Sequence, residues 1–135
     1  MGTDVTAQEE SRTVAAQDVQ VFSLGQRAER EGPLAVVPGL GNVVSTFVIA
    51  GSSSTRGLRL TITGLSLTTG SPAAVLVQPR QSANQEFNFS DEFAVQIITT
   101  ASDRILCRIM RLDADGGWGQ DLRLDLFIVD SVINP

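Results

Sequence analysis

The sequence predicts an all-β protein of about seven or eight strands, and three observations support this fold class. Short segments rich in Val, Ile, Leu, Phe and Thr recur along the chain. Several of them alternate apolar and polar residues, which is typical of strands buried on one face. Turn-forming Gly, Pro, Asn and Asp separate the segments, and no stretch shows a sustained helical period. We therefore expect an antiparallel β-sandwich or a jelly-roll, with a barrel as the related alternative.

The first 18 residues differ from the rest of the chain. They are polar, contain Glu9, Glu10 and Arg12, and lack a sustained apolar period. We expect residues 1–18 to form a flexible N-terminal arm, either disordered or ordered against a neighbouring subunit. Residues 19–135 then form a single β-sandwich domain, because a chain of 135 residues with 42% apolar content suits one core.

The predicted strands are short segments bounded by turn-forming residues. In chain order they are Val19–Leu24, Pro33–Leu40, Val43–Ala50, Gly57–Thr63, Ala73–Gln78, Phe93–Thr100, Arg104–Leu112 and Asp121–Asp130. The cleanest alternation is in the fourth segment, where Leu58, Leu60 and Ile62 share one face. That segment is expected to be buried on one side.

The last two strands are expected to form a hairpin across the loop Asp113–Gln120. Placing Arg108 opposite Asp125 makes one face wholly apolar, so we assign that face to the core. Its members are Ile105, Cys107, Ile109, Leu124, Leu126 and Ile128. The other face mixes charged and apolar side chains, namely Arg104, Leu106, Arg108, Met110, Arg123, Asp125, Phe127 and Val129. Arg, Met and Phe are enriched at protein contacts, so we expect this mixed face to lie at a homo-oligomeric interface.

Composition excludes several kinds of chemistry. The chain has no His and no Lys, which excludes Ser-His-Asp and Cys-His catalysis, most zinc sites, lysine Schiff bases and the P-loop. The net charge of −5 argues against nucleic acid as the main partner. The single cysteine, Cys107, alternates within an apolar strand and is expected to be a small core residue. We expect neither enzymatic activity nor a cofactor.

No transmembrane segment or signal peptide is evident in the sequence. The most apolar region, residues 33–50, is interrupted by prolines and glycines, and the N-terminal residues are polar and acidic. We therefore expect no membrane insertion.

Carboxylates are the remaining candidates for a chemical site. Asp113 and Asp115 have the spacing of the first half of a calcium loop, but Gly117 occupies the third acidic position and no closing Glu follows. A solvated loop is the simpler interpretation, and we predict no metal site. Asp91 and Glu92 would need a further carboxylate to act as glycosidase acids, so a charged loop end is the simpler interpretation there too.

Trp118 is the only tryptophan and has glycines at positions 116, 117 and 119. Two interpretations are open. The indole folds back over the end of the hairpin and caps the core, or it is exposed and anchors a partner protein or a sugar ring.

The segment Arg108–Asp130 has the pattern RxxRLD followed by GWGQxLRLDLxIVD. It resembles the C-terminal hairpins of small all-β virion proteins in tailed phages and gene-transfer agents, including head-decoration, head-spike and fibre-associated proteins. This resemblance implies a sandwich that oligomerises, attaches through a terminal arm, and resides in the virion after synthesis in the host cytoplasm. The strand count and size are also similar to those of the H-type lectin fold.

We therefore expect a non-enzymatic structural or attachment protein that assembles as a homo-oligomer on a larger particle. Its partners would be itself and other particle proteins. The alternative is a carbohydrate-binding module that uses Trp118 and loop carboxylates to bind surface glycans. The candidate interaction residues are Trp118, Asp113, Asp115, Arg108, Arg123, Asp125 and Phe127.

Overall fold

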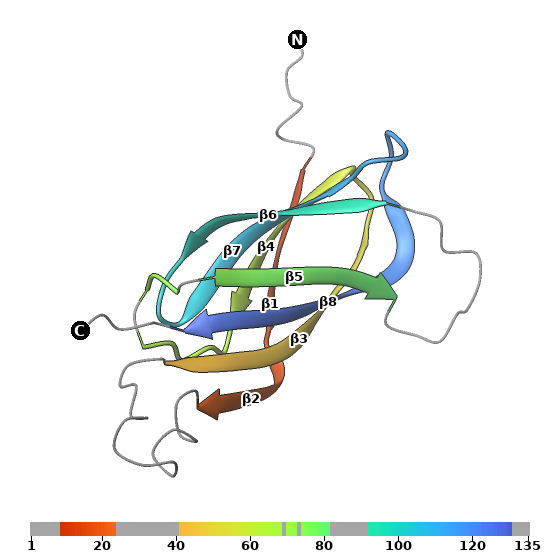
Figure 1. Ribbon diagram of the computed structural model, residues 1–135. Helices are drawn as coiled ribbons and strands as arrows, with labels where there is room; N and C mark the ends of the chain where they lie inside the picture. Colours follow the sequence, from red (N-terminus) through yellow and green to blue (C-terminus); the bar gives the residue numbers. More distant parts are fainter. Residues whose placement is uncertain (1–8, 24–40, 69, 73, 82–91, 131–135) are drawn as a thin grey trace, which may run out of the picture.

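The computed structural model describes residues 9–23, 41–68, 70–72, 74–81 and 92–130, which form two four-stranded β-sheets packed face to face (Figure 1). The strands are β1 (Glu10–Ala15), β2 (Gln17–Ser23), β3 (Asn42–Ser53), β4 (Gly57–Thr63), β5 (Ala74–Gln81), β6 (Phe93–Thr100), β7 (Arg104–Arg111) and β8 (Trp118–Asp130). The all-β sandwich predicted from the sequence is confirmed. The described part of the chain holds no helix of the length and apolarity that a membrane crossing requires.

The two sheets have different strand orders. Sheet A is β1-β4-β7-β6, and sheet B is β2-β3-β8-β5. Neighbouring strands are antiparallel except β1 and β4, which run parallel. Successive strands therefore often cross from one sheet to the other, as β3 to β4 and β7 to β8 do.

The core lies between the sheets and is formed by every second residue of the central strands. The fully buried side chains include Leu58, Leu60 and Ile62 of β4, Ile105, Cys107 and Ile109 of β7, and Leu124, Leu126 and Ile128 of β8. These are the residues that the alternating pattern assigned to the interior, so the predicted inward faces of β4, β7 and β8 are confirmed.

The predicted hairpin between β7 and β8 is wrong. The two strands belong to different sheets and contribute to the core from opposite sides. Arg108 lies opposite Arg59 and not opposite Asp125, which lies between Phe47 and Gln78. Alternation shows which face a strand buries, but a hairpin and a crossing between sheets bury the same residues. It therefore could not identify the neighbouring strand.

The mixed face predicted for that hairpin is accordingly split between two surfaces. Leu106 and Met110 lie with Arg104 and Arg108 on the outer face of sheet A, because they alternate with the buried residues of β7. The β8 residues, Arg123, Asp125, Phe127 and Val129, lie on the outer face of sheet B.

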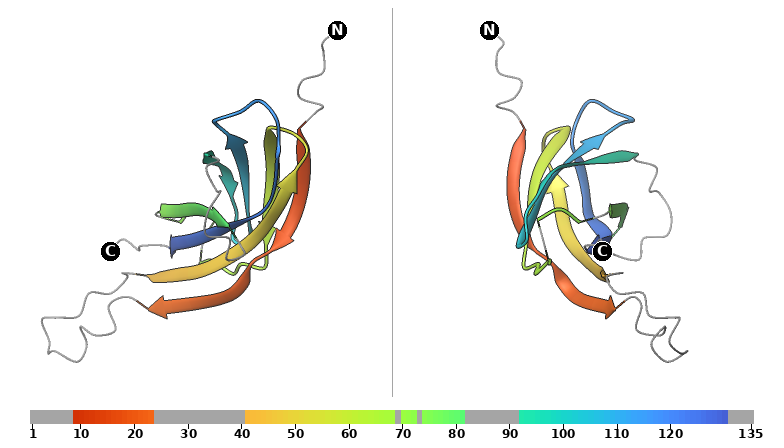
Figure 2. Two further views of the ribbon diagram at one scale, coloured as in Figure 1. Left: turned by 90° about the vertical axis from the view of Figure 1, so that its right-hand side faces the viewer. Right: turned by 60° about the vertical axis from the view of Figure 1, so that its left-hand side comes forward.

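The flexible arm predicted for residues 1–18 is wrong for its described part. Glu10–Ala15 forms the edge strand β1, in register with β4 from Leu58 to Thr63. The chain then crosses to sheet B and continues as β2, so one segment runs along the side of both sheets (Figure 2). Residues 1–8 lie outside the described residues.

A polar side chain explains why β1 lacked an apolar period. Arg12 is opposite buried Leu60 and therefore faces inward. Its Nη1 donates hydrogen bonds to the backbone oxygens of Ala50, at 2.5 Å, and Ser52, at 2.8 Å. The inner side of β1 is thus held partly by hydrogen bonds to sheet B, in place of a continuous row of apolar residues.

The remaining strand boundaries differ little from the prediction. β8 begins at Trp118, earlier than expected, and β5 continues past Pro79. Because β5 is an edge strand paired only with β8, a residue without an N–H is tolerated there. The predicted strand Pro33–Leu40 lies outside the described residues.

Candidate functional site on the outer face of sheet B

The outer face of sheet B carries four rows of side chains that run across its strands, and we call it the sheet B face. The registers define these rows from β5 through β8 and β3 to β2. They are Ala74, Val129, Val43 and Phe22; Leu76, Phe127, Ser45 and Gln20; Gln78, Asp125, Phe47 and Gln17; and Arg80, Arg123 and Ile49. One end of the face is therefore apolar and the other is charged.

The apolar end exposes large side chains to solvent. Phe22 is 53% exposed, Leu76 is 61% exposed and Phe127 is 49% exposed. Phe127 and Leu76 are directly opposite each other on neighbouring strands, where Cβ atoms are roughly 4.5–5.5 Å apart. Single exposed apolar residues are ordinary, but several on one sheet face indicate an interaction surface.

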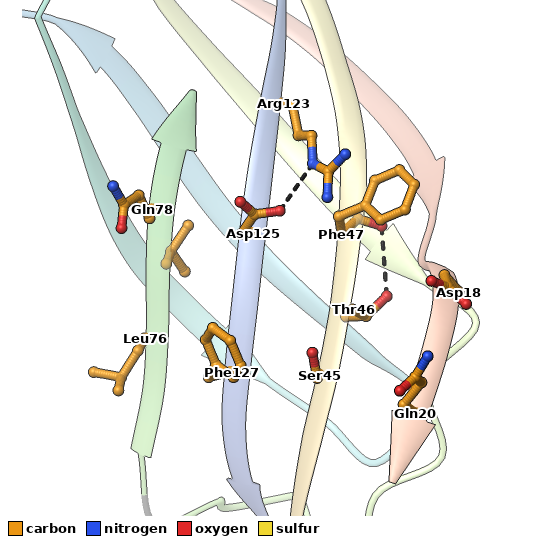
Figure 3. Close-up of a pocket in the computed structure, with 11 residues that line it drawn as sticks. Asp18, Gln20, Ser45, Thr46, Phe47, Leu76, Gln78, Arg123, Asp125 and Phe127 are labelled. Carbon is orange, nitrogen blue, oxygen red and sulfur yellow. Dashed lines mark hydrogen bonds and ion pairs between the residues drawn. The ribbon is translucent and has the colours of Figure 1, made fainter. Parts of the chain in front are cut away.

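The charged end contains an ion cluster centred on Asp125. Its Oδ1 accepts a hydrogen bond from Arg123 Nε at 2.8 Å, and its Oδ2 lies 3.4 Å from Arg80 Nε. The Arg123 guanidinium also lies over the Phe47 ring, with 3.9 Å between Cζ and the ring centroid (Figure 3). Contacts to a carboxylate and an aromatic face hold this guanidinium in one orientation.

A groove of about 520 Å³ lies over the centre of the face. Its lining joins the apolar pair Leu76 and Phe127 to the ion cluster, and Asp18 and Gln20 of β2 form its far side (Figure 3). Ser45, Thr46, Phe47, Val77 and Gln78 complete the described lining. The groove offers apolar contact, hydrogen-bond donors and acceptors, and both signs of charge to whatever occupies it.

Trp118 is buried, with only 4% of its surface exposed. Its Nε1 donates a hydrogen bond to the Gly51 carbonyl oxygen at 2.8 Å, and its ring packs edge-on against Phe93 with centroids 5.0 Å apart. The interpretation of Trp118 as a cap over the core is confirmed, and the exposed-anchor interpretation is wrong. The neighbouring glycine has a packing role, because a Cβ at Gly117 would overlap the Ser53 carbonyl oxygen.

Asp113 ties the loop after β7 to neighbouring backbone. Its carboxylate accepts hydrogen bonds from Arg111 Nε at 3.0 Å and from the backbone N–H of Glu92 at 3.1 Å. The hydrogen bond from Arg111, followed by that from Glu92, holds the pKa of Asp113 below its usual value.

Asp115 is exposed. Among the described residues, no group of three or more His, Cys, Asp or Glu is placed to hold a metal ion.

Arg108 holds the start of β1. Its Nε lies 2.5 Å from Glu9 Oε2, and Arg59 Nε lies 3.3 Å from Glu9 Oε1. Arg108 therefore takes part in an ion pair on sheet A and does not belong to the sheet B face. Cys107, the preceding residue of β7, is buried in the core as predicted, and burial raises the pKa of its thiol to about 11.

Of the predicted interaction residues, only Arg123, Asp125 and Phe127 lie together on the sheet B face. The prediction missed Phe22, Phe47, Leu76 and Arg80, which come from three other strands. One local signal could have identified the apolar residues among them. Leu76 stands between Val75 and Val77, so the run has apolar residues on both faces of the strand where a solvent-facing side would normally be polar.

No protein family, curated protein or solved structure matches this chain. The fold defines the class of protein as a two-sheet β-sandwich, and the sheet B face is the surface from which its function can be inferred.

Proposed function

We propose that the protein is a non-enzymatic assembly protein that forms homo-oligomers through the sheet B face and attaches to a larger particle. The observation that carries this proposal is the exposure of Phe22, Leu76 and Phe127 on one face of one sheet. Covering these side chains removes apolar surface from water, which contributes roughly 25 cal/mol per Å² buried before the entropic cost of association is subtracted.

The composition of the face supports a protein partner. Phe and Arg are enriched at protein interfaces, and the four rows contain Phe22, Phe47, Phe127, Arg80 and Arg123. Arg123 is already ordered by Asp125 and Phe47, so less side-chain entropy is lost when a partner contacts it.

The charges of the face support a second copy of the chain as that partner. Arg80 and Arg123 are balanced by Asp125 and by Asp18 at the groove. A surface with balanced charges can meet its own copy without net repulsion, and a two-fold contact requires such self-complementarity. A standard interface buries roughly 800 Å² on each partner, and we place both the apolar and the charged end of the face within the contact.

The proposal of a larger particle, such as a phage-like virion with this protein as head decoration, spike or fibre component, rests on the sequence resemblance of Arg108–Asp130. The two strands of that segment belong to different sheets in this chain. The carbohydrate alternative has lost its stacking residue, because Trp118 is buried.

The test compares two substitutions of equally exposed apolar residues. Phe127→Asp places a charge in the centre of the sheet B face, whereas Leu112→Asp changes a residue that is 51% exposed and lies outside sheet B. Light scattering coupled to size exclusion should show a lower mass for Phe127→Asp and an unchanged mass for Leu112→Asp. Equal masses for both variants and the unmodified chain, or dissociation by both, would contradict the proposal.

A further inference from the structure

β2 is exposed along its whole length. All seven of its residues are exposed although the strand pairs with β3. Val21 is opposite buried Val44 and so faces the inner side of sheet B, yet it is 57% exposed. Phe22 is exposed on the outer side. Figure 1 shows β2 as the outermost strand beside β3, and β1, which continues into it, lies in the other sheet.

The other three edge strands each carry a feature that discourages pairing with a further strand. β1 has the inward-facing charges of Glu10 and Arg12, which are opposite buried Leu58 and Leu60. β5 contains Pro79, and β6 has a bulge between Ile97 and Thr99. Inward charges, prolines and bulges are devices by which proteins protect exposed sheet edges.

In β2 such devices, a bulge and the charge of Asp18, are confined to the start of the strand. The register shifts between Gln17 and Gln20, where Asp18 has a φ of 52°, and then continues without interruption to Ser23. The stretch Val19–Ser23 reads VQVFS and contains neither a charged residue nor a proline. An apolar edge of this kind is a template for another strand.

We propose that β2 of one copy pairs antiparallel with β2 of a second copy, joining two sheets B into one eight-stranded sheet. The inference rests on the proposed self-association but uses a different surface. A two-fold axis perpendicular to the sheet keeps inner residues opposite inner residues, since directly opposite residues share a face. Val21 then lies opposite Val21 of the second copy, and Gln20 lies opposite Phe22 of the second copy.

This pairing accounts for both exposed apolar sides of β2. The two Val21 side chains cover each other on the inner side, where each is 57% exposed in the single chain. On the outer side, Phe22 lies beside Gln20 of the second copy, and the aliphatic part of that side chain covers part of the ring. A strand of another protein could make the same backbone hydrogen bonds. A second copy of this chain also places an apolar Val21 opposite Val21 on the inner side.

The edge contact and the face contact are compatible in one assembly. β2 pairs through the edge that no other described strand occupies, whereas the sheet B face is perpendicular to that edge, so one chain can make both contacts at once. Two two-fold contacts close into a tetramer with D2 symmetry when their axes intersect at right angles. The assembly that we propose is such a tetramer, a dimer of edge-paired dimers.

Cysteine crosslinking tests the pairing. Cys107 is buried, so Val21→Cys introduces the one readily accessible thiol. Directly opposite residues have Cα atoms roughly 4.5–5.5 Å apart, which suits a disulfide. Ser23→Cys is the matched control: it is exposed on the same strand, but in this register its copies are offset by four positions, or roughly 13 Å. Mild oxidation should crosslink most of the Val21→Cys protein and little of the Ser23→Cys protein.

The outcomes separate this inference from the proposed function. In the Phe127→Asp background the mass should fall to that of a dimer while Val21→Cys still crosslinks. If the unmodified chain is an oligomer but Val21→Cys crosslinks no better than Ser23→Cys, the β2 pairing is refuted and assembly through the sheet B face stands. If the unmodified chain is a monomer and neither variant crosslinks, both proposals are refuted.

Discussion

Replacement of Trp118 tests whether the indole caps the core at the start of β8. Trp118→Ala removes a side chain that is almost fully buried, and such truncations cost roughly 3–5 kcal/mol in the free energy of unfolding. Trp118→Phe keeps an aromatic ring near Phe93 but removes the donor to the Gly51 carbonyl oxygen. Loss of one partner from a buried hydrogen bond costs roughly 1–3 kcal/mol, so this variant should lie between the unmodified protein and Trp118→Ala.

The assay is urea unfolding followed by far-ultraviolet circular dichroism, because both variants lack the tryptophan that fluorescence would report. The slope m should stay unchanged while the midpoint falls. A double-mutant cycle with Phe93→Leu should give a coupling of roughly 0.5–1.5 kcal/mol for the edge-on ring pair. A cost below about 1 kcal/mol for Trp118→Ala would refute the assignment, because an exposed indole gives such values.

Three further predictions concern β1, Cys107 and Asp113. Arg12→Ala should lower the free energy of unfolding by roughly 1–3 kcal/mol, because the backbone oxygens of Ala50 and Ser52 lose their donor. Ser11→Ala, on the outward side of β1, should change the free energy of unfolding by less than about 0.5 kcal/mol. If denaturant unfolding gave the same change for Arg12→Ala and Ser11→Ala, β1 would not be packed against sheet B. Cys107 should resist a thiol reagent at pH 8 until the protein unfolds, because burial raises its pKa to about 11; rapid labelling of the native protein would contradict this. Asp113 has a lowered pKa in the folded protein, so it stabilises the fold above its unfolded pKa of about 4, and this contribution is lost as the pH falls through the folded value. Asp113→Asn should flatten the acid side of the stability profile, and an unchanged profile would argue against the contact with Arg111.

The sequence predicted the faces of the strands well and their neighbours poorly. In β4, β7 and β8, alternation identified the buried residues because each strand has one side on the core. The pairing of Arg108 with Asp125 failed because a crossing between sheets produces the same pattern as a hairpin. Neighbour choice depends on contacts between distant segments, as in the pairing of β3 with β8, and these leave no local signal.

The N-terminal strand and the candidate surface were missed for related reasons. β1 docks partly through Arg12, whose backbone partners in β3 cannot be identified from the sequence, so a docked strand resembled a polar arm. The sheet B face is assembled from four strands, and Phe127 becomes part of a surface only when Leu76 is placed beside it. The sequence could not show whether Trp118 is buried or exposed, because its contact with Phe93 depends on the tertiary fold.

Sedimentation equilibrium of the unmodified chain tests self-association most directly. Over a concentration series extending to tens of micromolar, we predict the mass of four chains at the upper end, with dissociation to two chains on dilution. A mass of one chain across the whole series would contradict the proposal that Phe22, Leu76 and Phe127 are covered by a second copy of the protein.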